Sequence, residues 1–187
     1  MYRSLILLLI FSLCVMFTGP VYSESGDRIG IGDICPSFFL RDIDGNDFFL
    51  SECVGEKAAK NYKGIIFSFC ASYCEPCKKE IPELEKLLEI YKDRGLGVYL
   101  VALEKKNRVQ KLIDETNTNL TVLVDRYLVV QKLLGFNGIP FTILIDNEGE
   151  VRLINTAFSE EKADEIMERF EHAVMDVLGI DSGNAAQ

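Results

Sequence analysis

The sequence of 187 residues has no tryptophan, a single histidine and fewer basic than acidic residues. The lone histidine, His172, excludes a metal site built from several imidazole groups. The chain has 20 Lys and Arg residues and 29 Asp and Glu residues, which gives a formal charge of −9. No cluster of basic residues stands out. Nucleic-acid binding is therefore excluded, because it requires a basic surface that neutralises phosphates.

Internal repeats, low-complexity stretches and linkers are also absent from the sequence. About half of the residues are hydrophobic, 48%, which is enough for one core in a chain of this length. This composition excludes a disordered or collagen-like chain. We therefore expect one folded domain that acts as a monomer.

A long hydrophobic run is missing as well, although a short one opens the chain. Leu5–Phe17 is almost wholly apolar and follows the single charge of Arg3. This pattern is typical of a secretory signal, so residues 1–23 are predicted to be a signal peptide and residues 24–187 the folded domain. A retained N-terminal membrane anchor is the alternative, although the run is shorter than the roughly 20 residues of a spanning helix. Either way the domain is expected in the periplasm or another extracytoplasmic compartment, where disulfides persist.

Hydrophobic periodicity predicts strands that alternate with helices. The expected strands cover 65–69, 98–103, 121–124, 141–146 and 150–155, and the expected helices cover 74–91, 105–115, 126–134 and 159–178. A turn signal at Asp44-Gly45-Asn46 adds a hairpin within Pro36–Leu50. The order predicts an α/β fold with a central mixed sheet, helices on both faces and an extra N-terminal β-hairpin.

The most reactive pattern in the chain is Cys74-Glu75-Pro76-Cys77, which lies between a predicted strand and a predicted helix. At a helix N-terminus, free N–H groups and the helix dipole stabilise a thiolate, so Cys74 is the expected nucleophile. Cys77 lies one turn further on and can close a disulfide. Attack by Cys74 on a substrate disulfide would give a mixed disulfide that Cys77 then resolves.

Other uses of two cysteines at this spacing lead to different functions. A structural zinc site would need a second ligand pair, and the sequence has no second Cys-x-x-Cys, so we expect no metal and no cofactor. A plain structural disulfide and a Cu(I) carrier remain alternatives, since thiolates suit Cu(I). A peroxiredoxin-like peroxidase is a further alternative, but no threonine directly precedes Cys74.

The residues around the cysteine pair resemble the active site of TlpA/ResA-type extracytoplasmic thioredoxins. The similarity lies in residues 67–82, 138–142 and 145–149, and in an Ala-Pro-x-Phe-like start at residues 33–38. The resemblance implies a thioredoxin-like fold and thiol–disulfide exchange outside the cytoplasm. It also implies disulfide-containing protein substrates, among them apocytochrome c during cytochrome c biogenesis, and an upstream membrane thiol donor.

The same resemblance implies how the site is built. Pro140 corresponds to the family's cis-proline, and the backbone of Ile139 would pair with a substrate strand. The side chains of Tyr73, Glu75 and Pro76 would lie at the substrate surface. The family usually has tryptophan where this chain has Tyr73 and Cys70, and we expect Cys70 to be a buried, inert thiol.

Glu80 is the expected proton carrier of the site. Ser68 stands where cytoplasmic thioredoxins carry a buried acid and cannot act as a base. In the family, the glutamate at the position of Glu80 lies beside the cysteine pair and serves the reductive chemistry. A partly desolvated carboxyl can take the proton of Cys77 and return it. The alternative is an exposed Glu80 paired with Lys78 or Lys79.

Cys35 and Cys53 flank the predicted hairpin at similar distances from its turn. A structural disulfide between them is therefore feasible, provided that the two Cα atoms lie within about 7 Å. Closing this loop would add about 3 kcal/mol of stability in the chain-entropy model.

Overall fold

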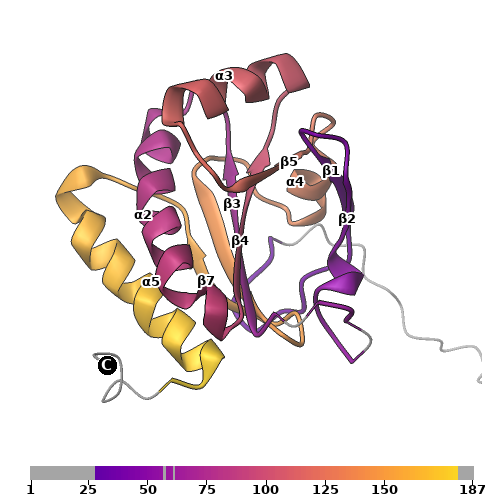
Figure 1. Ribbon diagram of the computed structural model, residues 1–187, viewed down its shortest axis with the longest axis vertical. Coiled ribbons are helices and arrows are strands. Elements are labelled where there is room, and N and C mark those ends of the chain that lie inside the picture. The colour runs from indigo at the N-terminus through magenta and orange to yellow at the C-terminus, as the bar shows by residue number, and fades with distance from the viewer. Residues whose placement is uncertain (1–27, 57, 61, 181–187) are drawn as a thin grey trace, which may run out of the picture.

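The computed structural model describes residues 28–56, 58–60 and 62–180, so the predicted signal peptide, residues 1–23, lies outside the described residues (Figure 1). The strands in these ranges are β1 (Phe39–Asp42), β2 (Asp47–Phe49), β3 (Gly64–Cys70), β4 (Leu96–Ala102), β5 (Thr121–Val124), β6 (Phe141–Asp146) and β7 (Val151–Asn155). The α-helices are α2 (Glu75–Tyr91), α3 (Lys106–Thr116), α4 (Val129–Leu133) and α5 (Ala163–Leu178). No helix in the part of the chain that the structure describes is both long and apolar enough to span a bilayer.

All seven strands belong to one mixed sheet in the order β2-β1-β5-β4-β3-β6-β7. The central strands β3, β4 and β5 run parallel, whereas β6 and β7 on one side and β1 and β2 on the other pair antiparallel. Strand β3 lies between β4 and β6 and is buried along its whole length. Parallel strands in the middle of such a sheet end at the same edge, and the cysteine pair follows the end of β3.

The sheet separates two hydrophobic cores, because alternate side chains of a strand point to opposite faces. Ile66 and Leu100 point to the face covered by α2, α3 and α5, and Phe67 and Val101 point to the other face. Helix α4 and the segment before β1 cover this second face. Figure 1 shows α2 and α5 packed together on one side of the sheet and α4 on the other.

These elements confirm the predicted fold class, a mixed sheet with helices on both faces and an added N-terminal hairpin. Most boundaries agree with the hydrophobic pattern to within two residues. Helix α5 begins later than expected, since the chain first makes a 3-10 turn at Glu160–Lys162 after Ser159. Ser159 also makes no side-chain cap for this turn.

The predicted disulfide between Cys35 and Cys53 is wrong, because both residues are free, buried thiols. The hairpin register pairs Phe39 with Phe49, and extending it would place Cys35 opposite Cys53. The ladder ends first, however, because the chain turns into a 3-10 helix at Leu50–Glu52. Cys35 leaves the hairpin on the other side, where its N–H donates to the carbonyl of Gly149 at 2.8 Å.

Candidate active site

The cysteine pair lies where β3 turns into α2. A tight turn after β3 brings the N–H of Cys74 to the carbonyl of Ala71 at 3.0 Å, and α2 begins with Cys74 as its N-cap. The Sγ of Cys74 accepts a hydrogen bond from the N–H of Cys77 at 3.2 Å, as expected at a helix start. Pro76 fits into the first turn because its missing N–H would have no partner there.

Cys74 and Cys77 form a disulfide, with 5.3 Å between their Cα atoms. Cys77 is completely enclosed, whereas Cys74 keeps 6% of its surface exposed. Cys74 is thus less open than the sequence suggests, because the bond turns its sulfur toward the buried partner. Cys74 is therefore the member of the pair that keeps contact with solvent, as a nucleophile requires.

Glu80 lies one turn after Cys77 and is fully buried, at 0% exposure. Its Oε2 accepts hydrogen bonds from the hydroxyl groups of Ser68 at 3.1 Å and Thr142 at 3.0 Å. Its Oε1 accepts one from the side-chain amide of Asn155 at 3.3 Å. The carboxyl group is therefore held by three neutral donors between α2 and the sheet.

These three donors form a single row across the sheet. The strand register places Ser68 of β3 directly opposite Thr142 of β6, and Thr142 directly opposite Asn155 of β7. All three are buried among apolar neighbours, and Glu80 extends from α2 onto the row. The pairing of β3, β6 and β7 alone brings the three donors together, so the sheet fixes the position of the carboxyl group.

The charge state of Glu80 follows from these surroundings. Burial raises the pKa of Glu80 above its ordinary value, and the hydrogen bonds from Thr142, Ser68 and Asn155 oppose part of that rise. The alternative of an exposed Glu80 held by a lysine is wrong. Lys78 pairs with Glu75 and Glu115 instead, and Lys79 pairs with Glu160.

A second loop reaches the same end of the sheet. The peptide bond between Ile139 and Pro140 is cis, as the family resemblance implies. Since β6 pairs with β3 from Phe141 and Phe69 onward, the register brings Pro140 beside Cys70 at the end of β3. The cis-proline loop thus ends next to the strand that leads into the cysteine pair, with Ile139 half-buried between the two cores.

The expected substrate-contacting residues differ in how open they are. Tyr73 is 70% exposed, and Glu75 and Pro76 are exposed beside it. Pro140 is buried. The open part of the site is therefore the turn before α2, whereas the cis-proline is buried next to the end of β3.

Cys70 is fully buried at the end of β3, on the same face as the cysteine pair. Burial raises the pKa of the Cys70 thiol, and the negative charges of Glu80 and Glu104 raise it further. This thiol therefore stays protonated at physiological pH, which fits the inert role expected from the sequence.

Several residues of the site are absent from the sequence-based prediction. Thr142 and Asn155 complete the pocket of Glu80, and Glu104 holds the turn before Cys74. The carboxylate of Glu104 accepts hydrogen bonds from the N–H of Ser72 and, at 3.2 Å, from its hydroxyl group. The sequence signal for such a residue is a polar side chain inside an apolar strand, as in Phe141-Thr142-Ile143. This signal points to Glu80 only when the pairing register of the strands is known.

The described ranges contain no group of three or more His, Cys, Asp or Glu side chains arranged to hold a metal ion. A redox-active cysteine pair lies at the start of a helix, and a buried carboxyl group lies one turn further along the same helix. These are the components of thiol–disulfide exchange.

Comparison with known proteins agrees with this chemistry. Residues 31–154 match the AhpC/TSA family. The thiol-disulfide oxidoreductase ResA of Halalkalibacterium halodurans is 32% identical over 139 residues, which cover 73% of this chain and 75% of that protein. The ResA of Geobacillus kaustophilus is 31% identical over 129 residues, covering 68% and 70% of the two chains.

A solved structure gives the same result for the fold. A Chlorobium tepidum protein described as a thiol:disulfide interchange protein DsbE superimposes with a TM-score of 0.70 at 27% identity, covering 81% of this chain and 100% of that one. The chain therefore belongs to the AhpC/TSA family and is a thioredoxin-like thiol–disulfide oxidoreductase of the TlpA/ResA type.

Proposed function

We propose that this protein reduces disulfides of other proteins in an extracytoplasmic compartment. In this proposal residues 1–23 direct export, as a cleaved signal or a retained anchor, and residues 24–187 form the redox domain. The N-terminal sequence supports the location, through its single early charge and short apolar run. The observation that carries the reducing direction is the fully buried Glu80 on the inner face of α2, one turn from Cys77.

The reaction begins with the reduced dithiol. The thiolate of Cys74 attacks one sulfur of the substrate disulfide, a mixed disulfide forms, and one substrate thiolate leaves. Cys77 then loses its proton and attacks the sulfur of Cys74. This step closes the Cys74–Cys77 bond and releases the second substrate thiolate. The substrate gains two electrons, which an upstream thiol donor in the membrane later restores to the pair.

Glu80 supports this direction in two ways. Its raised pKa allows the carboxyl group to take the proton of the enclosed Cys77 and to return it in the reverse step. Its negative charge, once ionised, opposes a thiolate in the same low-dielectric pocket. The reduced form is then less stable, which makes the pair a better electron donor.

The family resemblance extends the proposal to apocytochrome c, whose cysteines must be reduced before haem attachment. In this role Tyr73, Glu75 and Pro76 would contact the substrate around Cys74. The backbone of Ile139, ahead of Pro140, would pair with the substrate chain.

One set of measurements on the same sample tests the function. We expect insulin reduction with dithiothreitol as donor, no consumption of hydrogen peroxide, and no tight binding of Cu(I). The reduction potential should lie near the reducing end of a range that spans about 150 mV. A potential at the oxidising end would overturn the reductant assignment. Peroxide turnover without insulin reduction would favour the peroxidase, and tight Cu(I) binding without exchange activity would favour a copper carrier.

A further inference from the structure

A groove of about 550 Å³ lies directly beside the cysteine pair, and we name it the Tyr73 groove. It is bounded by the turn before Cys74, the start of α3 and the loop after β5. Its lining includes Tyr73, Leu103, Glu104, Lys105, Arg108 and Arg126. Because Tyr73 immediately precedes Cys74, a chain seated in this groove would present neighbouring residues to the reactive sulfur.

The groove is positively charged in an otherwise acidic protein. Lys105, Arg108 and Arg126 form no ion pair within the described residues. The one acid in the lining, Glu104, is already engaged by the N–H and hydroxyl groups of Ser72. Arg126 lies over the ring of Tyr127 at 4.1 Å, which holds its planar guanidinium group in place. Three cations are therefore available to an external anion.

Lys105 and Arg108 lie at the N-terminus of α3, where positive charges destabilise the helix. The first turn of this helix has no acidic residue and its N-cap, Lys105, makes no side-chain cap. Cations at a helix N-terminus are unfavourable, because the helix dipole is positive there. By contrast, the first turns of α2 and α5 carry Glu75 and the Asp164–Glu165 pair. A departure from local preference beside a reactive site is typical of a functional surface.

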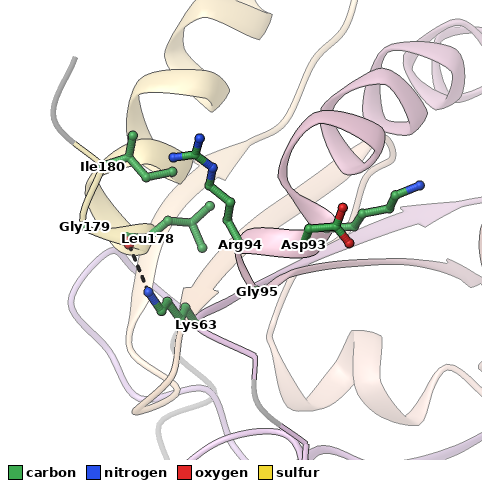
Figure 2. A pocket seen from close by; sticks show the side chains of 8 residues that line it. Lys63, Asp93, Arg94, Gly95, Leu178, Gly179 and Ile180 are labelled. Carbon is green, nitrogen blue, oxygen red and sulfur yellow. Dashed lines mark hydrogen bonds between the residues drawn. The ribbon is translucent and has the colours of Figure 1, made fainter. Parts of the chain in front are cut away.

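A second groove of about 550 Å³ provides an internal comparison (Figure 2). It lies next to Gly64, at the start of β3, about 20 Å along the strand from Cys70. Figure 2 shows the ammonium group of Lys63 reaching the carbonyl of Leu178, a contact of 3.5 Å. Lys92 pairs with Glu89 at 2.7 Å. Two of the three cations in this lining thus have partners within the protein, and the third, Arg94, shares the lining with the acid Asp93.

We propose that the Tyr73 groove binds an acidic stretch of the protein substrate, adjacent to the cysteine that Cys74 attacks. This inference rests on the proposed function and specifies the substrate class. The guanidinium groups of Arg108 and Arg126 suit the two oxygens of an Asp or Glu side chain, and Lys105 adds a third charge. The exposed ring of Tyr73 supplies an apolar contact for the same segment.

Two peptides with an intramolecular disulfide test the proposal. In one, Asp and Glu flank the attacked cysteine, and in the other Asn and Gln take their places. We expect the reduced full-length protein to reduce the acidic peptide about tenfold faster at low salt, with the preference declining at high salt. A third peptide carries the same acids far from the disulfide and separates local binding from general attraction. It should react like the neutral peptide.

Matched double variants locate the preference. Arg108→Gln with Arg126→Gln should bring the ratio of the two rates close to one, and Arg108→Glu alone, which changes the charge of the groove by the same amount, should lower the ratio to a similar extent. Lys92→Gln with Arg94→Gln, which removes two charges from the groove of Figure 2, should retain the full preference. Equal reduction of all peptides by the unmodified protein would overturn the inference alone. Failure to reduce any disulfide, including a small aromatic disulfide, would overturn the proposed function with it.

Discussion

Two pairs of buried cysteines lie on opposite faces of one sheet, and they differ in the groups that surround their sulfur atoms. Cys35 and Cys53 lie in the phenylalanine-rich core, where their thiols donate to the carbonyl groups of Pro36 and Phe49. Burial raises the pKa of Cys35 to about 12 and raises that of Cys53. Cys74 and Cys77 lie on the other face, at a helix start.

The comparison shows that enclosure does not decide what a cysteine does. Both pairs are buried, yet only Cys74 receives an N–H hydrogen bond from the first turn of a helix. Only its face of the sheet holds Glu80. A backbone donor at the sulfur favours the thiolate, whereas an apolar core with carbonyl neighbours favours the thiol.

The strongest test of this difference replaces single sulfurs. Cys74→Ser should abolish insulin reduction, and Cys77→Ser should accumulate mixed disulfides through Cys74, because nothing remains to resolve them. Non-reducing gels and mass mapping would detect the trapped species. Trapping by Cys74→Ser instead would reverse the two roles.

Cys35→Ala serves as the control from the other face, and it should retain exchange activity. In the untreated protein Cys35 and Cys53 should alkylate only after denaturation. A Cys35–Cys53 bond found by peptide mapping would contradict the structure.

A smaller effect on the exchange rate is expected when Glu80, the buried acid near the Cys74–Cys77 pair, is replaced by a neutral residue. Glu80→Gln preserves the shape of the side chain but cannot accept the proton of Cys77, so exchange should slow by about 100-fold near neutral pH. Stopped-flow rates from pH 5 to 9 should also lose the inflection that Glu80 provides. Glu89→Gln, at an exposed position near the other end of the same helix, is the matched control. An unchanged rate profile in Glu80→Gln would remove Glu80 from the mechanism.

The smallest expected effect concerns stability and its dependence on pH. Because the pKa of Glu80 is raised in the folded state, the protonated carboxyl favours folding, and this stability declines as pH rises above the unfolded pKa of about 4.3. The unfolding free energy of Glu80→Gln relative to the original protein should therefore be higher at pH 8 than at low pH. Near pH 4 the part of this difference that comes from ionisation should disappear.

Denaturant unfolding of the oxidised proteins measures this difference. Phe67→Leu, a core change on the opposite face, should lose about 1 kcal/mol at both pH values. A gain for Glu80→Gln that is the same at both pH values would show that packing, rather than ionisation, is responsible.

Local sequence patterns were sufficient for most of the fold. The alternation of apolar runs and turn residues located every strand, and the helix start at Cys74 followed from its place after a buried run. The Cys35–Cys53 expectation had the correct register, but spacing could not show that the chain leaves the hairpin at Leu50.

What sequence could not provide was proximity between distant segments. Ser68, Thr142 and Asn155 meet only because β6 lies between β3 and β7. The sequence analysis missed the basic Tyr73 groove although Lys105 and Arg108 are neighbours in the chain, and only the fold brings Arg126 to them from a different loop. Local motifs therefore predict the cysteine pair, whereas the order of the strands determines which distant residues join it.

The row of Ser68, Thr142 and Asn155 also constrains how this protein can diverge. Each member donates a hydrogen bond to the carboxyl group of Glu80, so an apolar replacement at one position leaves the acid with one partner fewer in a dry environment. If Glu80 is lost first, the row loses its common acceptor and its members become free to vary. Evolutionary paths away from this active site should therefore be ordered, with the acid on the helix changing before the polar residues on the strands.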